Sequence, residues 1–193
     1  VLIADNIAPT VDKIFALEQS ALTPLVAWLG AFAYTFQIYF DFAGYSAMAI
    51  GLALMFGFHF PENFNRPYLA SSITEFWKRW HMSLSRWFKD YVYIPLGGNQ
   101  KGVFRTYINL LIVFLITGLW HGAALTFVVW GLYYGVLLVF EKILTGKINF
   151  KINRTVGIMI TFLLVLVGWV IFRAESIEHA IFFISTMFSL GHI

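Results

Sequence analysis

The segment Thr117-Gly118-Leu119-Trp120-His121-Gly122-Ala123-Ala124 lies in the middle of an otherwise apolar stretch that covers residues 110–140. A stretch of that length can enter a bilayer, because about 20 apolar helical residues cross its hydrocarbon core. An ionisable side chain at such depth is costly, and it usually faces a protein interior or a water-filled cavity. His121 is therefore the first candidate for a functional residue.

The composition is that of a membrane protein. Of the 193 residues, 60% are hydrophobic and only 12% are charged, whereas about a quarter of the residues in an ordinary globular domain are charged. The mean hydropathy is +0.76. These values point to a membrane protein, and with the apolar runs, the amphipathic stretch and the family resemblance described below we expect an all-α fold, a polytopic bundle of transmembrane helices with amphipathic helices at the membrane interface.

Several classes of function are excluded by residue counts. The chain has no cysteine, which rules out disulfides and thiol nucleophiles. Its five histidines include no His-x-x-x-His pair, so no metal site is predicted. The net charge of +3 is too small for a nucleic-acid footprint, and we expect no nucleic-acid partner.

The longest apolar run, residues 21–60, predicts two spans rather than one. A helix of about 40 residues would far exceed a bilayer core of about 30 Å. We therefore expect a break at Asp41-Phe42-Ala43-Gly44, with spans near 22–40 and 45–60. Further apolar segments are expected at residues 108–125, 126–141, 155–172 and 180–190. Residues 1–20 are expected to form an interfacial helix or the tail of an earlier loop.

Lysine and arginine mark two loops as cytoplasmic. Seven lie in residues 62–107 and four in residues 142–154, and the positive-inside rule places both segments on one side. The chain between them must cross twice or re-enter. Two short legs with a bend at Gly118 and Gly122 would leave His121 deep in the membrane, lining a cavity. A short broken helix followed by one span is the alternative.

The segment after the first spans predicts a basic amphipathic helix. Ser72-Ile73-Thr74-Glu75 has the spacing of a capping box, and the helix should run to about Tyr93, before Pro95. Because it is amphipathic and basic, this helix is expected to lie in the membrane interface or to pack on the bundle. His81 falls on its apolar stripe. The stripe consists of Trp77, Trp80, Leu84, Trp87, Phe88 and Tyr91.

Several motifs in order resemble the membrane-bound O-acyltransferase family, in particular its bacterial alginate O-acetyltransferase branch. They are residues 39–46, 61–68, 76–91 and 95–99, followed by Trp120-His121-Gly122. The resemblance covers about residues 1–190 and corresponds to the C-terminal part of a family member. We therefore expect residues 1–193 to form a single integral-membrane acyltransferase domain, the C-terminal part of a longer chain.

The resemblance implies an enzyme that moves an acyl group from a cytoplasmic-side donor, acetyl-CoA or a similar thioester, to a hydroxyl. In this branch the acetyl group goes to an extracytoplasmic polysaccharide such as alginate, with partner proteins completing the transfer. It implies a multi-pass protein of the bacterial inner membrane, surrounded by lipid and holding no bound cofactor. It also implies that His121 is catalytic and that His81 is a second active-site residue.

The chemistry agrees with those assignments. A hydroxyl that attacks an acyl carbon needs a base, and histidine suits that task at neutral pH. His81 would orient the donor carbonyl, hydrogen-bond the developing oxyanion or hold the acceptor, and the sequence does not choose among these roles. Because no Gly-x-Ser-x-Gly motif is present, direct transfer is favoured over an acyl-enzyme.

Five further residues are candidates for substrate binding, namely Asp41, Trp77, Arg79, Trp80 and Trp120. Each also has a structural interpretation. Asp41 suits a hydrogen-bonding residue at a helix end or the partner of an arginine. The tryptophans suit packing and interfacial anchorage, and Arg79 suits a lipid headgroup. For His81, its place on the apolar stripe suits a packing role.

Two alternative functions stay open at this point. A transporter or flippase would use Asp41, His81 and His121 as a proton relay. Transfer of D-alanine to teichoic acid is the alternative within the same family. The ordered tryptophan and histidine motifs favour the acyltransferase over the transporter.

Overall fold

A computed structural model describes residues 2–147 and 153–189, and in these ranges every regular element is helical. Four helices are long and apolar enough to cross a membrane, which confirms the predicted all-α membrane fold. The chain divides into two compact units, residues 1–62 with 169–193 and residues 63–168. The α-helices are α1 (Ala4–Phe15), α2 (Pro24–Met55), α3 (Ile73–Trp77), α4 (Met82–Phe88), α5 (Val103–His121), α6 (Leu125–Lys147), α7 (Arg154–Arg173) and α8 (Ile177–Phe188).

Helix α2 is continuous over 32 residues, so the break expected at residues 41–44 is wrong. The Thr23 side chain caps its first turn and Pro24 opens it, as helix starts favour. Gly44 weakens a helix by only about 1 kcal/mol, which a long run of helix-forming neighbours offsets. At about 1.5 Å per residue α2 exceeds a bilayer core, so in a membrane it must tilt or extend beyond the core.

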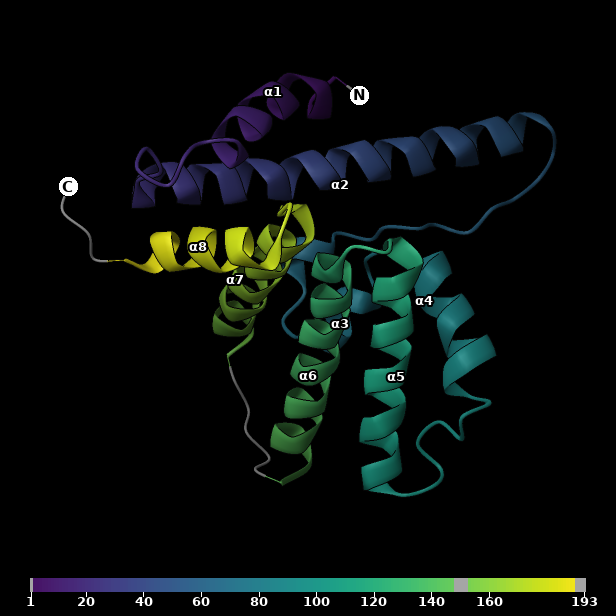
Figure 1. The fold of residues 1–193 in the computed structure, drawn as a ribbon. Coiled ribbons are helices and arrows are strands. Elements are labelled where there is room, and N and C mark those ends of the chain that lie inside the picture. The colour runs from purple at the N-terminus through teal and green to yellow at the C-terminus, as the bar shows by residue number, and fades with distance from the viewer. Residues whose placement is uncertain (1, 148–152, 190–193) are drawn as a thin grey trace. The chain divides into compact units, whose positions relative to one another are not determined.

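The first unit packs α1 and α8 against α2. Phe15 of α1 stacks on Phe183 of α8, with ring centroids 4.4 Å apart, and Trp28 Nε1 of α2 donates to the Met187 carbonyl at 2.7 Å. Figure 1 shows α1 beside α2. The helical alternative for residues 1–20 is therefore correct.

The second unit is built on an antiparallel hairpin of α5 and α6 (Figure 1). The hairpin has the two legs that we expected, but the legs, of 19 and 23 residues, are full spans by length and not short ones. The bend follows His121, the last residue of α5, so the expected place of Gly118 at the bend is wrong because Gly118 lies within α5. His121 thus lies at the opposite end of the hairpin from the basic segments that precede α5 and end α6.

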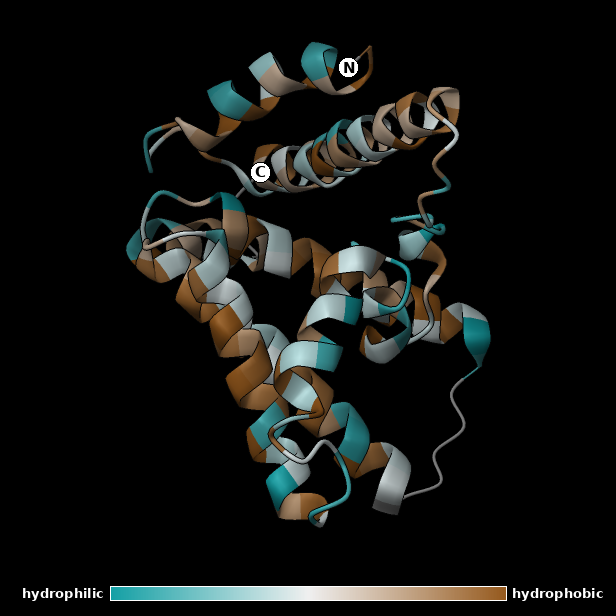
Figure 2. Ribbon diagram, turned by 90° about the vertical axis from the view of Figure 1, so that its right-hand side faces the viewer, coloured by the Kyte–Doolittle hydropathy of each residue, from teal (hydrophilic) through white to brown (hydrophobic). Residues whose placement is uncertain are grey.

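Two glycines allow α5 and α6 to cross closely. A Cβ atom on Gly131 would lie 2.2 Å from the Phe114 carbonyl oxygen, and one on Gly118 would lie 2.3 Å from the Phe127 carbonyl oxygen. Small residues at helix crossings let membrane helices gain van der Waals contact. Figure 2 shows hydrophobic residues along much of the long helices.

The expected continuous helix over residues 72–93 is wrong. Helix α3 ends at Trp77, α4 begins at Met82, and a π-helical turn, Lys89–Tyr93, follows α4. His81 between them has a φ of 45°, in the left-handed region. Of the predicted stripe, Trp77, Trp80 and Phe88 are buried, whereas Trp87 and Tyr91 are exposed.

The loop before α3 explains the interruption. The Asn63 carbonyl accepts the Met82 N–H at 2.9 Å, and the Arg79 carbonyl accepts the Asn65 N–H at 2.9 Å. These bonds to residues 63–65 replace helical ones, so α3 and α4 form two separate helices.

We predict that Gly131→Ala destabilises the protein by about 1–3 kcal/mol, because the added methyl would press on a backbone carbonyl that cannot turn away. The measurement is the thermal unfolding midpoint of the detergent-solubilised protein. Gly146→Ala on the same helix is the control, since its Cβ would meet open space. Equal midpoints for the two variants would contradict the close crossing.

Candidate active site

Helix α3 is held in place by a carboxylate from α6. Glu141 Oε2 accepts the Ile73 N–H at 2.7 Å, and both Glu141 oxygens lie 3.3 Å from the Thr74 nitrogen. The first turn of a helix leaves N–H groups without helical partners, and a carboxylate is a favourable acceptor there. The contact ties the start of α3 to the basic end of the hairpin.

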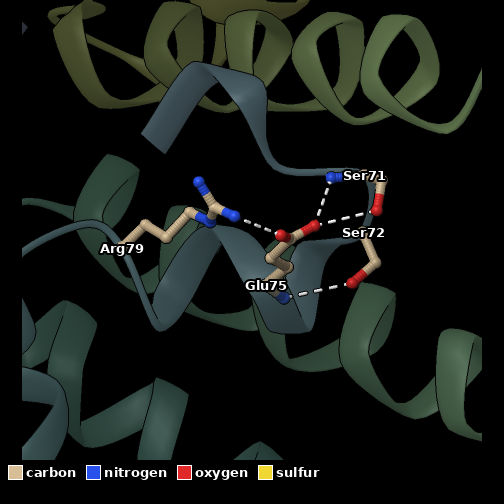
Figure 3. A network of polar contacts seen from close by, with 4 residues as sticks. All are labelled: Ser71, Ser72, Glu75 and Arg79. Atoms are coloured by element: carbon tan, nitrogen blue, oxygen red, sulfur yellow. Dashed lines mark hydrogen bonds and ion pairs between the residues drawn. The ribbon is translucent and has the colours of Figure 1, made fainter. Parts of the chain in front are cut away.

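The predicted capping box is present in a modified form (Figure 3). Ser72 Oγ accepts the Glu75 N–H at 3.1 Å, as expected. The Glu75 carboxylate, however, accepts the backbone N–H and hydroxyl of Ser71 at 2.6 and 2.8 Å. Those bonds, with the Ser71 N–H first, hold the pKa of Glu75 below its usual value. Arg79, one of the candidate substrate-binding residues, forms an ion pair with Glu75 of α3. Its side chain therefore also helps to stabilise α3.

Two of the candidate tryptophans lie in the core. Trp77 packs edge-on against Tyr134 and Phe114, with ring centroids 5.0 Å away in both cases. Trp80 is 4% exposed and stacks on Phe76 at 5.7 Å. This aromatic packing fixes the end of α3 against α5 and α6, and it leaves little of either indole for a substrate.

His121 and His81 approach the same indole from different parts of the chain. The Trp120 ring lies 4.9 Å from the His121 ring and 6.4 Å from the His81 ring, centroid to centroid. His121 also packs edge-on against the buried Trp130 at 5.1 Å. Trp120 itself is 58% exposed. The fold therefore joins two motifs that are 40 residues apart at the bend of the hairpin.

His81 is half-buried and has polar neighbours on one side of its ring. Its Nδ1 lies 3.3 Å from Asn63 Oδ1 and 3.3 Å from Ser83 Oγ. Burial, with a smaller contribution from His121, lowers the pKa of His81 to about 4. His81 is therefore neutral near pH 7 and can act as a base or a hydrogen-bond acceptor.

A cavity of about 460 Å³ runs between α5 and the segment of α3 and α4. Its lining includes Met82, next to His81, and Thr117, one helical turn before His121. Two lining residues are thus close in sequence to the histidines, although neither histidine lines the cavity. Its wall is mostly apolar, from Leu84, Phe88, Leu110, Val113, Phe114 and Leu138, and its cationic members are Lys78, Arg86 and Lys89.

One predicted site residue does not belong to this unit. Asp41 lies in the other unit, exposed on α2. Conversely, Asn63, Ser83 and Glu141 touch the site or hold it, and the sequence analysis did not single them out. Asn63 stands in a proline- and asparagine-rich loop, a context that marks a turn and gives no sign of a histidine partner.

A family model described as membrane-bound O-acyltransferase matches residues 4–178. The chain is 54% identical over 99% of its length to a probable alginate O-acetylase of Azotobacter vinelandii, of which it covers 38%. It is 43% identical over its full length to a peptidoglycan O-acetyltransferase of Helicobacter pylori, covering 37%. Over 77% of its length it is 36% identical to a teichoic acid D-alanyltransferase of Bacillus subtilis, covering 41%. The chain thus spans about two fifths of these relatives.

We predict that Glu141→Ala removes the acceptor for the first turn of α3 and destabilises the protein by about 1–3 kcal/mol. Hydrogen exchange of the Ile73 and Thr74 amides should accelerate, because their N–H groups lose the carboxylate. Lys142→Ala, an exposed neighbour on α6, is the control. Unchanged exchange in Glu141→Ala would show that α3 does not depend on this contact.

Proposed function

We propose a function from the premise that this chain belongs to the membrane-bound O-acyltransferase family, whose model it matches over residues 4–178. The protein transfers an acetyl group from a thioester donor to a hydroxyl of an extracytoplasmic polysaccharide, with His121 as the general base. The observation that carries the proposal is the meeting of His81 and His121 at Trp120. Two half-buried imidazoles beside a cavity are suited to proton transfer during acyl transfer.

The reaction requires one proton to move. The acceptor hydroxyl oxygen forms a bond to the acyl carbon while the carbon–sulfur bond of the donor breaks. His121 takes the hydroxyl proton as that bond forms and gives it to the departing thiolate, so the imidazole returns to its neutral state. The aromatic packing of His121 against Trp130 at 5.1 Å holds the ring in one orientation for this transfer.

The cavity supports a donor with an apolar arm and anionic groups, such as acetyl-CoA. Its apolar wall suits an alkyl or thioester arm, while Lys78, Arg86 and Lys89 supply positive charge for phosphates. The lining residues Thr117 and Met82 lie one helical turn before His121 and next to His81 along the chain. We infer that a thioester in the cavity reaches the site from there, with its charged part among the cations.

The identity values support acetyl transfer to a polysaccharide. Identity is 54% to the probable alginate O-acetylase and 36%, over a smaller share of the chain, to the D-alanyltransferase. The acceptor is accordingly alginate or a related polymer outside the bacterial inner membrane. The hairpin bend with His121 lies opposite the basic, cytoplasmic-type segments, which favours an acceptor on the extracytoplasmic side. We infer from the family that extracytoplasmic partner proteins complete the delivery.

We predict that His121→Ala abolishes polymer acetylation while membrane insertion persists, because the attacking hydroxyl loses its base. The measurement is the O-acetyl content of cell-surface polysaccharide, normalised to the inserted protein. His59→Ala, at an exposed position in the other unit, is the control. Unchanged acetylation in His121→Ala would refute the assignment, and lost export with normal acetylation of residual polymer would favour a transporter. D-alanyl ester in place of acetyl would identify the alternative transfer.

We predict that the combined change Lys78→Gln, Arg86→Gln and Lys89→Gln raises the KM for acetyl-CoA at least about tenfold, since each charge-assisted phosphate contact contributes about 1.5–3 kcal/mol. Michaelis–Menten kinetics with membranes or purified intact protein measure this change. Lys142→Gln, outside the cavity lining, is the control. An unchanged KM with a lower kcat would place the donor elsewhere.

A further inference from the structure

The proposed function leaves a polar cluster around His81 unexplained. Asn63 Oδ1 lies 3.1 Å from the Ser83 backbone nitrogen, 2.9 Å from Ser83 Oγ and 3.3 Å from His81 Nδ1. The same asparagine accepts the Met82 N–H through its main-chain carbonyl at 2.9 Å. One residue of the preceding loop therefore contacts both the backbone and the ring at the interruption between α3 and α4.

The backbone contact decides which end of the Asn63 amide faces the cluster. A main-chain N–H can only donate, so the atom opposite Ser83 N must be the carbonyl oxygen and not the amide nitrogen. The Ser83 hydroxyl donates to the same oxygen. The lone pairs of Ser83 Oγ are then available to His81 Nδ1, which lies 3.3 Å from Ser83 Oγ.

His81 Nδ1 consequently faces two acceptors. If Nδ1 were unprotonated, its lone pair would oppose the lone pairs of Asn63 Oδ1, a repulsive contact. With a proton on Nδ1, the ring donates into the cluster and every contact becomes a hydrogen bond. In a neutral imidazole, one nitrogen carries the proton and the other accepts, so His81 Nε2 presents a lone pair.

Resting on the proposed function, we propose that Asn63 and Ser83 are positioning residues that hold His81 as the Nδ1–H tautomer, so that Nε2 accepts a hydrogen bond from a second hydroxyl of the acceptor sugar, next to the one whose proton His121 takes. This chooses among the three roles that the sequence allowed for His81. A neutral ring with its only proton on Nδ1 has no donor at Nε2 for a carbonyl or an oxyanion. The group that it meets must be a donor, and a second hydroxyl of the acceptor sugar is such a donor, since the proton of the reacting hydroxyl goes to His121.

The backbone at His81 supports a positioning role for Asn63. A residue with a Cβ rarely adopts a φ of 45°, and this conformation is what turns the chain from α3 into α4. The bond from Met82 N–H to the Asn63 carbonyl stabilises the turn, while the Asn63 side chain orients the ring. Ring orientation and tautomer are thus set by the same residue, as second partners of functional histidines commonly do.

The test is nitrogen-15 NMR of histidine-labelled intact protein in lipid, with the His81 signals assigned by their loss in His81→Gln. In the wild type, we expect a protonated Nδ1 and an unprotonated Nε2 near pH 7. Asn63→Leu, which removes the acceptor, should redistribute the proton toward Nε2 and lower kcat about a hundredfold, because a misplaced substrate can cost about that factor. The KM for the acyl donor should stay unchanged.

Rescue by a matched substitution separates positioning from a merely structural role. Asn63→Asp keeps an acceptor for all three donors, so it should retain the Nδ1–H tautomer and most of the activity. Asn65→Leu, at an exposed asparagine of the same loop, is the control and should change neither. An unprotonated Nδ1 in the wild type, or an unchanged tautomer in Asn63→Leu, would overturn the proposal.

A failure of this inference can be distinguished from a failure of the proposed function. If His121→Ala kept full acetylation, the assignment of the base would fail, while the NMR spectrum would still report the His81 tautomer. If the tautomer were wrong while His121→Ala abolished acetylation, only the inference on Asn63 and Ser83 would fall.

Discussion

The close crossing of α5 and α6 is the constraint on which the rest of the unit of residues 63–168 depends. Glycines at 118 and 131 bring the two backbones into contact, since a Cβ at either place would meet a carbonyl oxygen of the other helix within 2.3 Å. The crossing fixes the bend just after His121. It also sets the wall of aromatic rings against which Trp77 of α3 packs.

Hydrogen bonding then decides where α3 and α4 lie on that hairpin. A segment packed within a membrane protein must satisfy its backbone groups internally, because lipid offers no partners. Glu141 satisfies the start of α3, and Asn63 satisfies the start of α4. These two contacts place His81 at the bend, next to Trp120, and the chemistry proposed for the site depends on both.

The sequence predicted the local features well and the long-range ones incompletely. The capping signal at Ser72 and the hairpin around Gly122 are local patterns of residue type, and both are present. The break expected in α2 was wrong because the thickness of a bilayer does not by itself interrupt a helix. No proline lies in α2 after its first turn to do so. The continuous helix over residues 72–93 was wrong because bonds to Asn63 and Asn65 compete with helical ones.

By itself, the sequence determined the helical membrane character of the chain and marked His81 and His121 as candidates, because apolar run lengths and ordered motifs are written in residue order. Only the tertiary structure decided that the two histidines meet at Trp120, and that Asn63 and Ser83 face one ring nitrogen of His81. Such juxtapositions arise from helix packing and from hydrogen bonds between distant residues. No periodicity along the chain encodes them, which is why the sequence left the role of His81 open.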